Sequence, residues 1–94
     1  MKWYRRQALH YFHVRVRHFS ARLAVETPRV LLSNARSCWG SCNARREVRL
    51  SWRLMQASPH VVDYVVAHEL AHLKEMNHSA RFWALVAQLE PAFK

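Results

Sequence analysis

The chain has 94 residues, which gives room for one domain and no second core. An apolar content of 51% with 12% aromatic residues excludes a disordered chain. Two cysteines do not make a disulfide scaffold, and the longest apolar stretch, 61–67, is interrupted by Asp63 and is too short to span a bilayer. The start has no signal-peptide core. We therefore expect a soluble protein of the reducing cytoplasm with no membrane partner.

The net charge of +9 is concentrated in the first half of the chain. Residues 1–53 hold 12 Lys and Arg against two Glu, a balance of +10, whereas residues 54–94 hold three basic and four acidic residues, a balance of −1. A basic surface can attract nucleic acid or acidic proteins. A solvated cationic surface explains the same pattern equally well. Nucleic acid therefore stays an open class of partner.

The first segment is predicted to be a helix. Its apolar residues step by three and four along one stripe: Leu9, Phe12, Val16, Phe19 and Leu23. Residues 12–17 also alternate as a strand would, but the helical stripe is longer and Pro28 follows its end.

Three short strands are predicted next. Residues 29–33 form one, and residues 36–42 and 47–52 flank the polar segment 43–46 as the arms of a hairpin. The second arm is expected to be half-buried, because Val48, Leu50 and Trp52 alternate with polar residues.

Two helices are predicted in the last part of the chain. Ser58 can cap the first, and Pro59 suits its first position because that residue needs no N–H donor. This helix is expected to run to Met76, with Asn77 as a left-handed stop. Ser79 can cap the last helix, whose apolar stripe is Phe82, Leu85, Val86 and Leu89.

His68 and His72 are four residues apart on the predicted helix, so both imidazoles leave the same face and can converge on one metal ion. Glu69 is rotated by about 100° from His68, which places it beside the metal as a general base and not as a ligand. His-Glu-x-x-His alone arises by chance in about 3% of chains of this composition. The strongly apolar surroundings of the motif argue against surface histidines, because placing polar side chains among apolar ones costs free energy unless they have partners or a function.

A catalytic zinc site needs a third protein ligand and an open fourth position. Glu75 lies on the same face as His68 but about 10.5 Å along the axis, too far to share one ion with both histidines. His78 follows the break at Asn77, where the chain can fold back toward the helix. We therefore predict His68, His72 and His78 as ligands of one Zn²⁺.

Other candidate sites are weaker. His10 and His13 share a helical face but have no carboxylate or third ligand near them, so they are expected to be surface residues. Cys38 and Cys42 lie about 13 Å apart if their segment is a strand, which is too far to chelate one ion, and they are expected to be small buried side chains. Four tryptophans are expected in or near the core: Trp3, Trp39, Trp52 and Trp83.

Four segments together resemble the YgjP-like metallopeptidase family, which is similar to the SprT-like zinc peptidases. They are Cys38-Trp39-Gly40-Ser41-Cys42, residues 49–54, residues 63–73 and residues 76–83. The resemblance implies an α+β, zincin-like fold in which an active-site helix packs on a small three-stranded sheet with flanking helices. It also implies that His68, His72 and His78 bind zinc and that Glu69 is the catalytic acid/base.

The chain departs from the family pattern in three places. Cys38 stands where the family usually has a basic residue, residues 44–46 lack the usual turn glycine, and members tend to carry an additional N-terminal region. We expect residues 1–94 to be a single zincin-like metallopeptidase domain, either complete or the catalytic portion of a longer protein.

The predicted activity is zinc-dependent hydrolysis of peptide bonds in a protein or peptide substrate. Segment 36–42 could pair with an extended substrate as an added strand, and Tyr64 is a weak candidate for stabilising the oxyanion. A nucleic-acid-associated protease and a non-catalytic, zinc-stabilised binding module remain alternatives. A fourth protein ligand on the metal would indicate the binding module.

Overall fold

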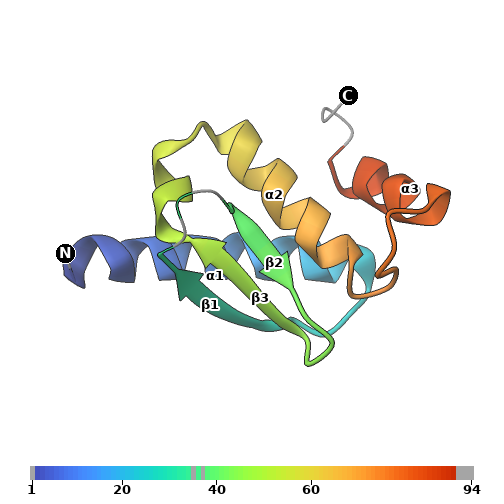
Figure 1. The fold of residues 1–94 in the computed structure, drawn as a ribbon, viewed down its shortest axis with the longest axis horizontal. Helices are drawn as coiled ribbons and strands as arrows, with labels where there is room; N and C mark the ends of the chain where they lie inside the picture. Colours follow the sequence, from blue (N-terminus) through green and yellow to red (C-terminus); the bar gives the residue numbers. More distant parts are fainter. Residues whose placement is uncertain (1, 35, 37, 91–94) are drawn as a thin grey trace.

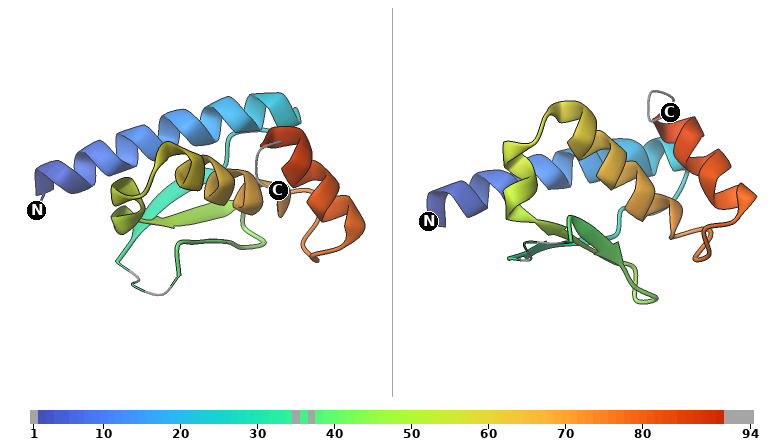
Figure 2. Two further views of the ribbon diagram at one scale, coloured as in Figure 1. Left: turned by 90° about the horizontal axis from the view of Figure 1, so that it is seen from above. Right: turned by 45° about the horizontal axis from the view of Figure 1, so that its top comes forward.

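Helices form one layer of the molecule and a small sheet forms the other (Figures 1 and 2). The computed structural model describes residues 2–34, 36 and 38–90. The elements in chain order are α1 (Lys2–Leu23), β1 (Arg29–Ser33), β2 (Gly40–Cys42), β3 (Glu47–Ser51), the 3₁₀ helix η1 (Trp52–Gln56), α2 (Pro59–Ala71) and α3 (Ala80–Leu89). The predicted α+β architecture, with an active-site helix on a three-stranded sheet, is confirmed.

The long helix α1 forms the back of the molecule and packs against β1 and α2. Its buried stripe contains the predicted Phe12, Val16, Phe19 and Leu23, but Leu9 is 39% exposed and Ala8 is buried instead. The prediction was wrong at Leu9, because the buried face of α1 at this level is formed by Ala8, which lies four residues before Phe12. α1 ends at Leu23, and the next residue, Ala24, adopts a left-handed φ of 59°.

The sheet has the strand order β1-β3-β2. β1 is parallel to β3, with Arg29 opposite Glu47, and β2 is antiparallel to β3, with Gly40 opposite Leu50. The hairpin is therefore confirmed, but its first strand begins at Gly40 and not at residue 36. Residues 35 and 37 lie outside the described part of the chain. β2 has an unpaired outer edge among the described residues, which becomes important at the site.

The hairpin turn uses Asn43 where glycine would be the usual solution. The Asn43 side-chain oxygen accepts hydrogen bonds from the backbone N–H groups of Arg45 (2.9 Å) and Glu47 (3.2 Å). These bonds hold a tight turn in which Arg46 adopts a φ of 62°.

α2 crosses above β2 and carries the histidines of the predicted motif. Ser58 caps it as predicted, with its hydroxyl accepting from the N–H of Val61 at 3.4 Å. The helix ends at Ala71, not at Met76, and Asn77 is not left-handed. The early end has a local cause: the N–H of His72 bonds the carbonyl of Glu69, which tightens the last turn.

α3 lies at one end of the molecule and packs against α2. Its predicted cap is confirmed, because the Ser79 hydroxyl accepts from the N–H of Phe82 at 3.3 Å. Phe82, Val86 and Leu89 form its buried stripe.

Trp52 packs against the core as predicted, but the other three tryptophans and one cysteine lie nearer the surface than predicted. Trp3, Trp39 and Trp83 are 70%, 48% and 37% exposed, and Cys38 is exposed. The core instead consists of Phe, Leu and Val from α1, β3 and α2. In a domain this small the interior has little room for large indoles. Among the described residues, no helix combines the length and the apolar character needed to cross a membrane.

Candidate metal centre

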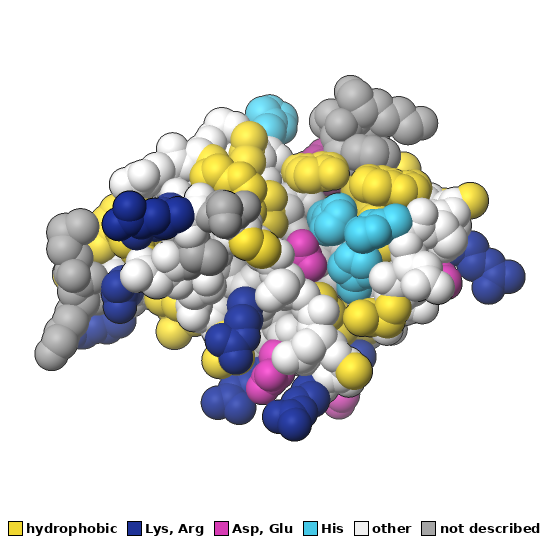
Figure 3. Space-filling view, viewed as in Figure 1, with side chains coloured by type: hydrophobic (Ala, Val, Ile, Leu, Met, Phe, Trp, Pro, Cys, Tyr) yellow, Lys and Arg dark blue, Asp and Glu magenta, His cyan; other side chains and the backbone are white. Residues whose placement is uncertain are grey.

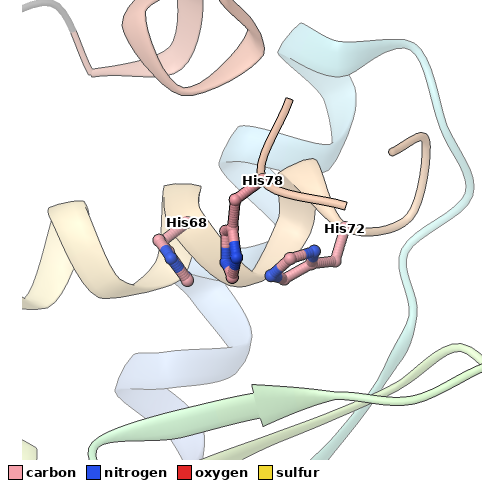
Figure 4. A group of neighbouring side chains, drawn as sticks. All are labelled: His68, His72 and His78. Atoms are coloured by element: carbon pink, nitrogen blue, oxygen red, sulfur yellow. The ribbon is translucent and has the colours of Figure 1, made fainter. Parts of the chain in front are cut away.

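Three histidines converge at the C-terminal end of α2 (Figure 4). His68 and His72 project from α2 one turn apart, and His78 reaches back from the segment that precedes α3. One potential ligand atom from each lies within 4.8 Å of the other two. The structure thus brings together the three residues that the sequence predicts.

Two hydrogen bonds orient the imidazoles of α2. Nδ1 of His68 lies 3.0 Å from Oε2 of Glu69, and Nδ1 of His72 lies 3.1 Å from the backbone carbonyl oxygen of Glu75. A proton on Nδ1 satisfies both contacts and leaves each Nε2 lone pair available to a metal. Glu75 contributes through its backbone and not its carboxylate, a role that the residue type could not reveal.

Glu69 is buried beside the histidines, with 7% of its surface exposed. Gly40 provides the space for it, because a Cβ there would come within 3.2 Å of Cγ of Glu69 and 3.0 Å of Cδ2 of Leu50. This role of Gly40 was not predicted from the sequence. The available signal was that Gly40 is the only glycine of the chain.

An open cleft of about 350 Å³ runs between the histidines and the outer edge of β2. Its lining residues are Gly40, Ser41, Cys42, His68, Glu69, His72, Met76 and His78. The space-filling view shows the histidines gathered on this face with acidic surface beside them, while basic side chains lie mostly to the left and below (Figure 3).

Cys42 lines the cleft without joining the group of histidine ligand atoms. Burial raises the pKa of the Cys42 thiol, and the negative charge of Glu69 raises it further. The thiol therefore stays protonated at neutral pH, so Cys42 is a poor nucleophile.

Phe82 supports the histidine cluster from behind. Its buried ring lies 5.0, 4.5 and 4.8 Å from the ring centroids of His68, His72 and His78. Trp83 stacks on His78 at 6.0 Å. α3 thus restricts the third histidine, which comes from a loop. The sequence analysis identified Phe82 only as part of an apolar stripe.

The other candidate residues lie outside the cluster. His10 and His13 are exposed on α1 and belong to no group of potential metal ligands in the described residues. Tyr64 is half-buried, packs against the core and does not line the cleft. Its ring also lies 6.0 Å from that of His68, so Tyr64 packs beside the histidine cluster.

Comparisons with known proteins agree with this architecture. The chain is similar to a UTP pyrophosphatase of Escherichia coli K12, with 35% identity over 54 residues, which is 57% of this chain and 32% of that protein. The chain thus spans about a third of that relative. A crystal structure of the metallopeptidase zymogen of Pyrococcus abyssi abylysin has the same fold, with a TM-score of 0.74 at 22% identity over 86% of this chain and 81% of the other. A family model for the YgjP-like metallopeptidase domain matches residues 1–94, so the chain belongs to the YgjP-like metallopeptidase family.

Proposed function

We propose that this chain is a zinc-dependent peptidase domain in which His68, His72 and His78 bind one Zn²⁺ and Glu69 is the general base. The observation that carries the proposal is the convergence of three histidine ligand atoms within 4.8 Å, beside a buried carboxylate and an open cleft. Two free cysteines fit a reducing compartment, and we place the activity in the cytoplasm.

The donor set fits zinc. Imidazole is a preferred zinc ligand, and ligands at tetrahedral positions around zinc are about 3.4 Å apart. Small side-chain rotations, chiefly of the exposed His78, would bring the three histidines from their present separation to that distance. The group has three members in the described part of the chain, which leaves a fourth position for the reactant.

Bound zinc would supply a Lewis acid that polarises a peptide carbonyl and lowers the pKa of a coordinated water. Glu69 would be the residue that accepts a proton from the attacking water and returns it to the leaving amine. Its Oε2 contacts His68, which fixes the carboxylate and leaves the other oxygen for proton transfer. Burial keeps Glu69 in a low-dielectric setting, where its effect on a reacting proton is strong.

The outer edge of β2 provides a binding surface for an extended substrate. Backbone groups of Trp39 and Asn43 bond to β3, through Ser51 N–H to the Trp39 carbonyl (2.9 Å) and Asn43 N–H to the Glu47 carbonyl (3.2 Å). Because the backbone groups of successive residues point to alternate sides of an antiparallel strand, those of Gly40 and Cys42 face away from β3. The Gly40 carbonyl accepts from the thiol of Cys38 at 3.2 Å, a contact that an added strand would replace. A peptide added there would lie across the histidines.

Two other hypotheses have specific support. The name of the relative in E. coli favours a nucleotide pyrophosphatase, in which the same base would activate water toward phosphorus. The basic first half of the chain favours a nucleic-acid-associated peptidase. Parallel assays with an unfolded protein, with UTP, and with the protein substrate plus DNA across a salt series separate the three.

Glu69→Gln tests the proposal. The zinc-loaded variant should keep one zinc per chain and lose about 10²–10⁴-fold in turnover, since the proton acceptor is gone and the ligands remain. Glu26→Gln, an exposed carboxylate away from the cleft, is the matched control and should retain full turnover. Full activity in Glu69→Gln with zinc bound would contradict the proposal.

A further inference from the structure

A second cavity lies at the start of β2, just beyond the cleft. Its volume is about 250 Å³, and it is lined by residues of the segment before β2 and of η1: Arg36, Cys38, Trp39, Ser51, Arg53, Gln56 and Ala57. Two arginines and an exposed indole line this one cavity. Such a site suits a ligand in which an anionic group, which the arginines would bind, is attached to an apolar part, which the indole would cover.

Neither arginine has an acidic partner. Among the described residues, no carboxylate lies within salt-bridge distance of Arg36 or Arg53. Within the described part of the chain, the guanidinium of Arg53 donates from Nη2 to the neutral amide oxygen Oδ1 of Asn34 at 3.2 Å, and its buried Nε has no hydrogen-bond partner there. An uncompensated, partly buried cation attracts an anionic ligand more strongly than one in bulk water.

Arg53 is held in place before any ligand arrives. Its Cζ lies 4.6 Å from the ring centroid of Trp52, and the Asn34 oxygen that accepts from Arg53 also accepts from Nε1 of Trp52 at 2.7 Å. A guanidinium fixed by stacking loses little freedom when it binds a carboxylate.

The position of the cavity links it to the proposed peptidase site. Cys38 and Trp39 line the cavity, and Gly40, the first residue of β2, lines the cleft, so consecutive residues of the chain line the two hollows. A peptide bound on the outer edge of β2 and extended past Gly40 would therefore run toward the cavity.

We propose that this cavity is a specificity subsite that binds a carboxylate of the peptide substrate, with Arg36 and Arg53 as its cationic walls and Trp39 packed on the adjoining methylene groups. The proposal rests on the proposed peptidase function. A Glu or Asp side chain and a C-terminal carboxylate share this chemistry, so substrates with amidated ends separate the two sources.

The test compares pairs of peptides that differ only in having Glu or Gln at a single position, and this position is varied on both sides of the scissile bond. All of these peptides have amidated ends. One additional Gln peptide has a free C-terminus. The zinc-loaded wild type should cleave the best Glu peptide, or the free-acid peptide, at least tenfold faster in kcat/KM than its neutral match. Arg36→Glu, an exposed position, should abolish this ratio, because cleavage of the acidic peptide falls to the rate of its neutral match or below. Arg17→Glu, an equal charge change on α1, should retain the wild-type ratio. Arg53→Lys, which keeps the charge but not the planar fork, should reduce the ratio.

Binding of the same peptides to Glu69→Gln, followed by fluorescence anisotropy, separates the two proposals. If the protein binds acidic peptides selectively, Arg36→Glu abolishes this binding and the wild type cleaves none of the peptides, the subsite proposal holds and the peptidase proposal is overturned. Cleavage with equal rates for Glu, Gln and free-acid peptides would overturn the subsite and keep the peptidase. A third outcome would overturn the carboxylate proposal in favour of a phosphate ligand. In that outcome the protein shows no preference among the peptides, UTP displaces the bound peptide, and Arg36→Glu abolishes this displacement.

Discussion

α1 and α2 pack on the same small sheet, but they differ in what their polar residues do. α1 has 22 residues, buries one narrow apolar stripe and carries most of its charged groups outward. α2 has 13 residues, of which seven are buried, and Glu69 is one of the seven. The comparison shows that a short helix with a buried face can hold a buried carboxylate beside two partly buried imidazoles at its C-terminal end, while a longer helix supplies the scaffold.

One ion pair connects the two helices. Arg15 of α1 binds Asp63 of α2 in a bidentate manner, at 2.9 Å and 3.0 Å. Asp63 interrupts the apolar stretch 61–67, and this interruption was the signal in the sequence for an interhelical partner. Each prediction below tests whether α1 supports the fold while α2 and the strand beside it supply the chemistry.

The largest expected effect on stability comes from the core side of α1. Phe12→Ala removes a fully buried ring and should lower the free energy of unfolding by about 3–5 kcal/mol. Urea denaturation followed by circular dichroism measures this. Val14→Ala, an exposed position on α1, should stay within about 0.5 kcal/mol of wild type. Equal losses in the two variants would contradict the assigned stripe.

The next effect concerns the contact between β2 and α2. Gly40→Ala forces a Cβ against Cγ of Glu69 and Cδ2 of Leu50, and should cost about 1–3 kcal/mol. It should also lower turnover, because Glu69 must move. Ala44→Ser in the exposed hairpin turn should change neither quantity. Wild-type turnover in Gly40→Ala would show that the position of Glu69 is not limiting.

A smaller effect is expected for the ion pair between the helices. A double-mutant cycle with Arg15→Ala and Asp63→Ala should give a coupling energy of about 1 kcal/mol, because both side chains are partly solvated. Raising the salt concentration should reduce it. A coupling energy near zero at low salt would show that the pair adds nothing to the docking of α1 on α2.

The smallest expected effect is a pH dependence of the protein's stability that arises from Glu47 in the hairpin. The hydrogen bond from the Asn43 side chain lowers the pKa of Glu47, which also lies near Arg29. A lowered folded-state pKa stabilises the protein above the unfolded value of about 4.3, and this stabilisation disappears as pH falls through the folded value. The difference in Tm between wild type and Glu47→Gln should therefore be present at pH 7, shrink as the pH falls below about 4.3, and vanish at a pH where Glu47 is protonated in the folded state as well. A difference that persists there would contradict the assignment.

Local signals in the sequence predicted much of the fold and of the candidate site. Helical spacing predicted α1, Ser58-Pro59 and Ser79 predicted where two helices begin, and the His68 and His72 pair with His78 predicted the cluster. These features depend on residues close together in the chain. The prediction for His68 and His72 holds although the predicted end of α2 was wrong. His68 lies within α2, and His72 is its C-cap residue.

Features that depend on distant contacts could not be predicted in this way. The parallel pairing of β1 with β3, the space that Gly40 leaves for Glu69 and the platform that Phe82 forms all join segments far apart in sequence. The exposure of Trp39 and the left-handed Ala24 also follow from tertiary packing and not from residue preference. Residue type alone would have given the opposite answer for both.

Zinc K-edge X-ray absorption on the zinc-loaded chain, together with zinc analysis, tests the central claim most directly. The account predicts one zinc per chain, a first shell of three nitrogen ligands and one oxygen at about 2.0–2.1 Å, and loss of one nitrogen in His78→Ala. A shell closed by four protein ligands, including a sulfur at about 2.3 Å from Cys42, would contradict it and identify a structural zinc module.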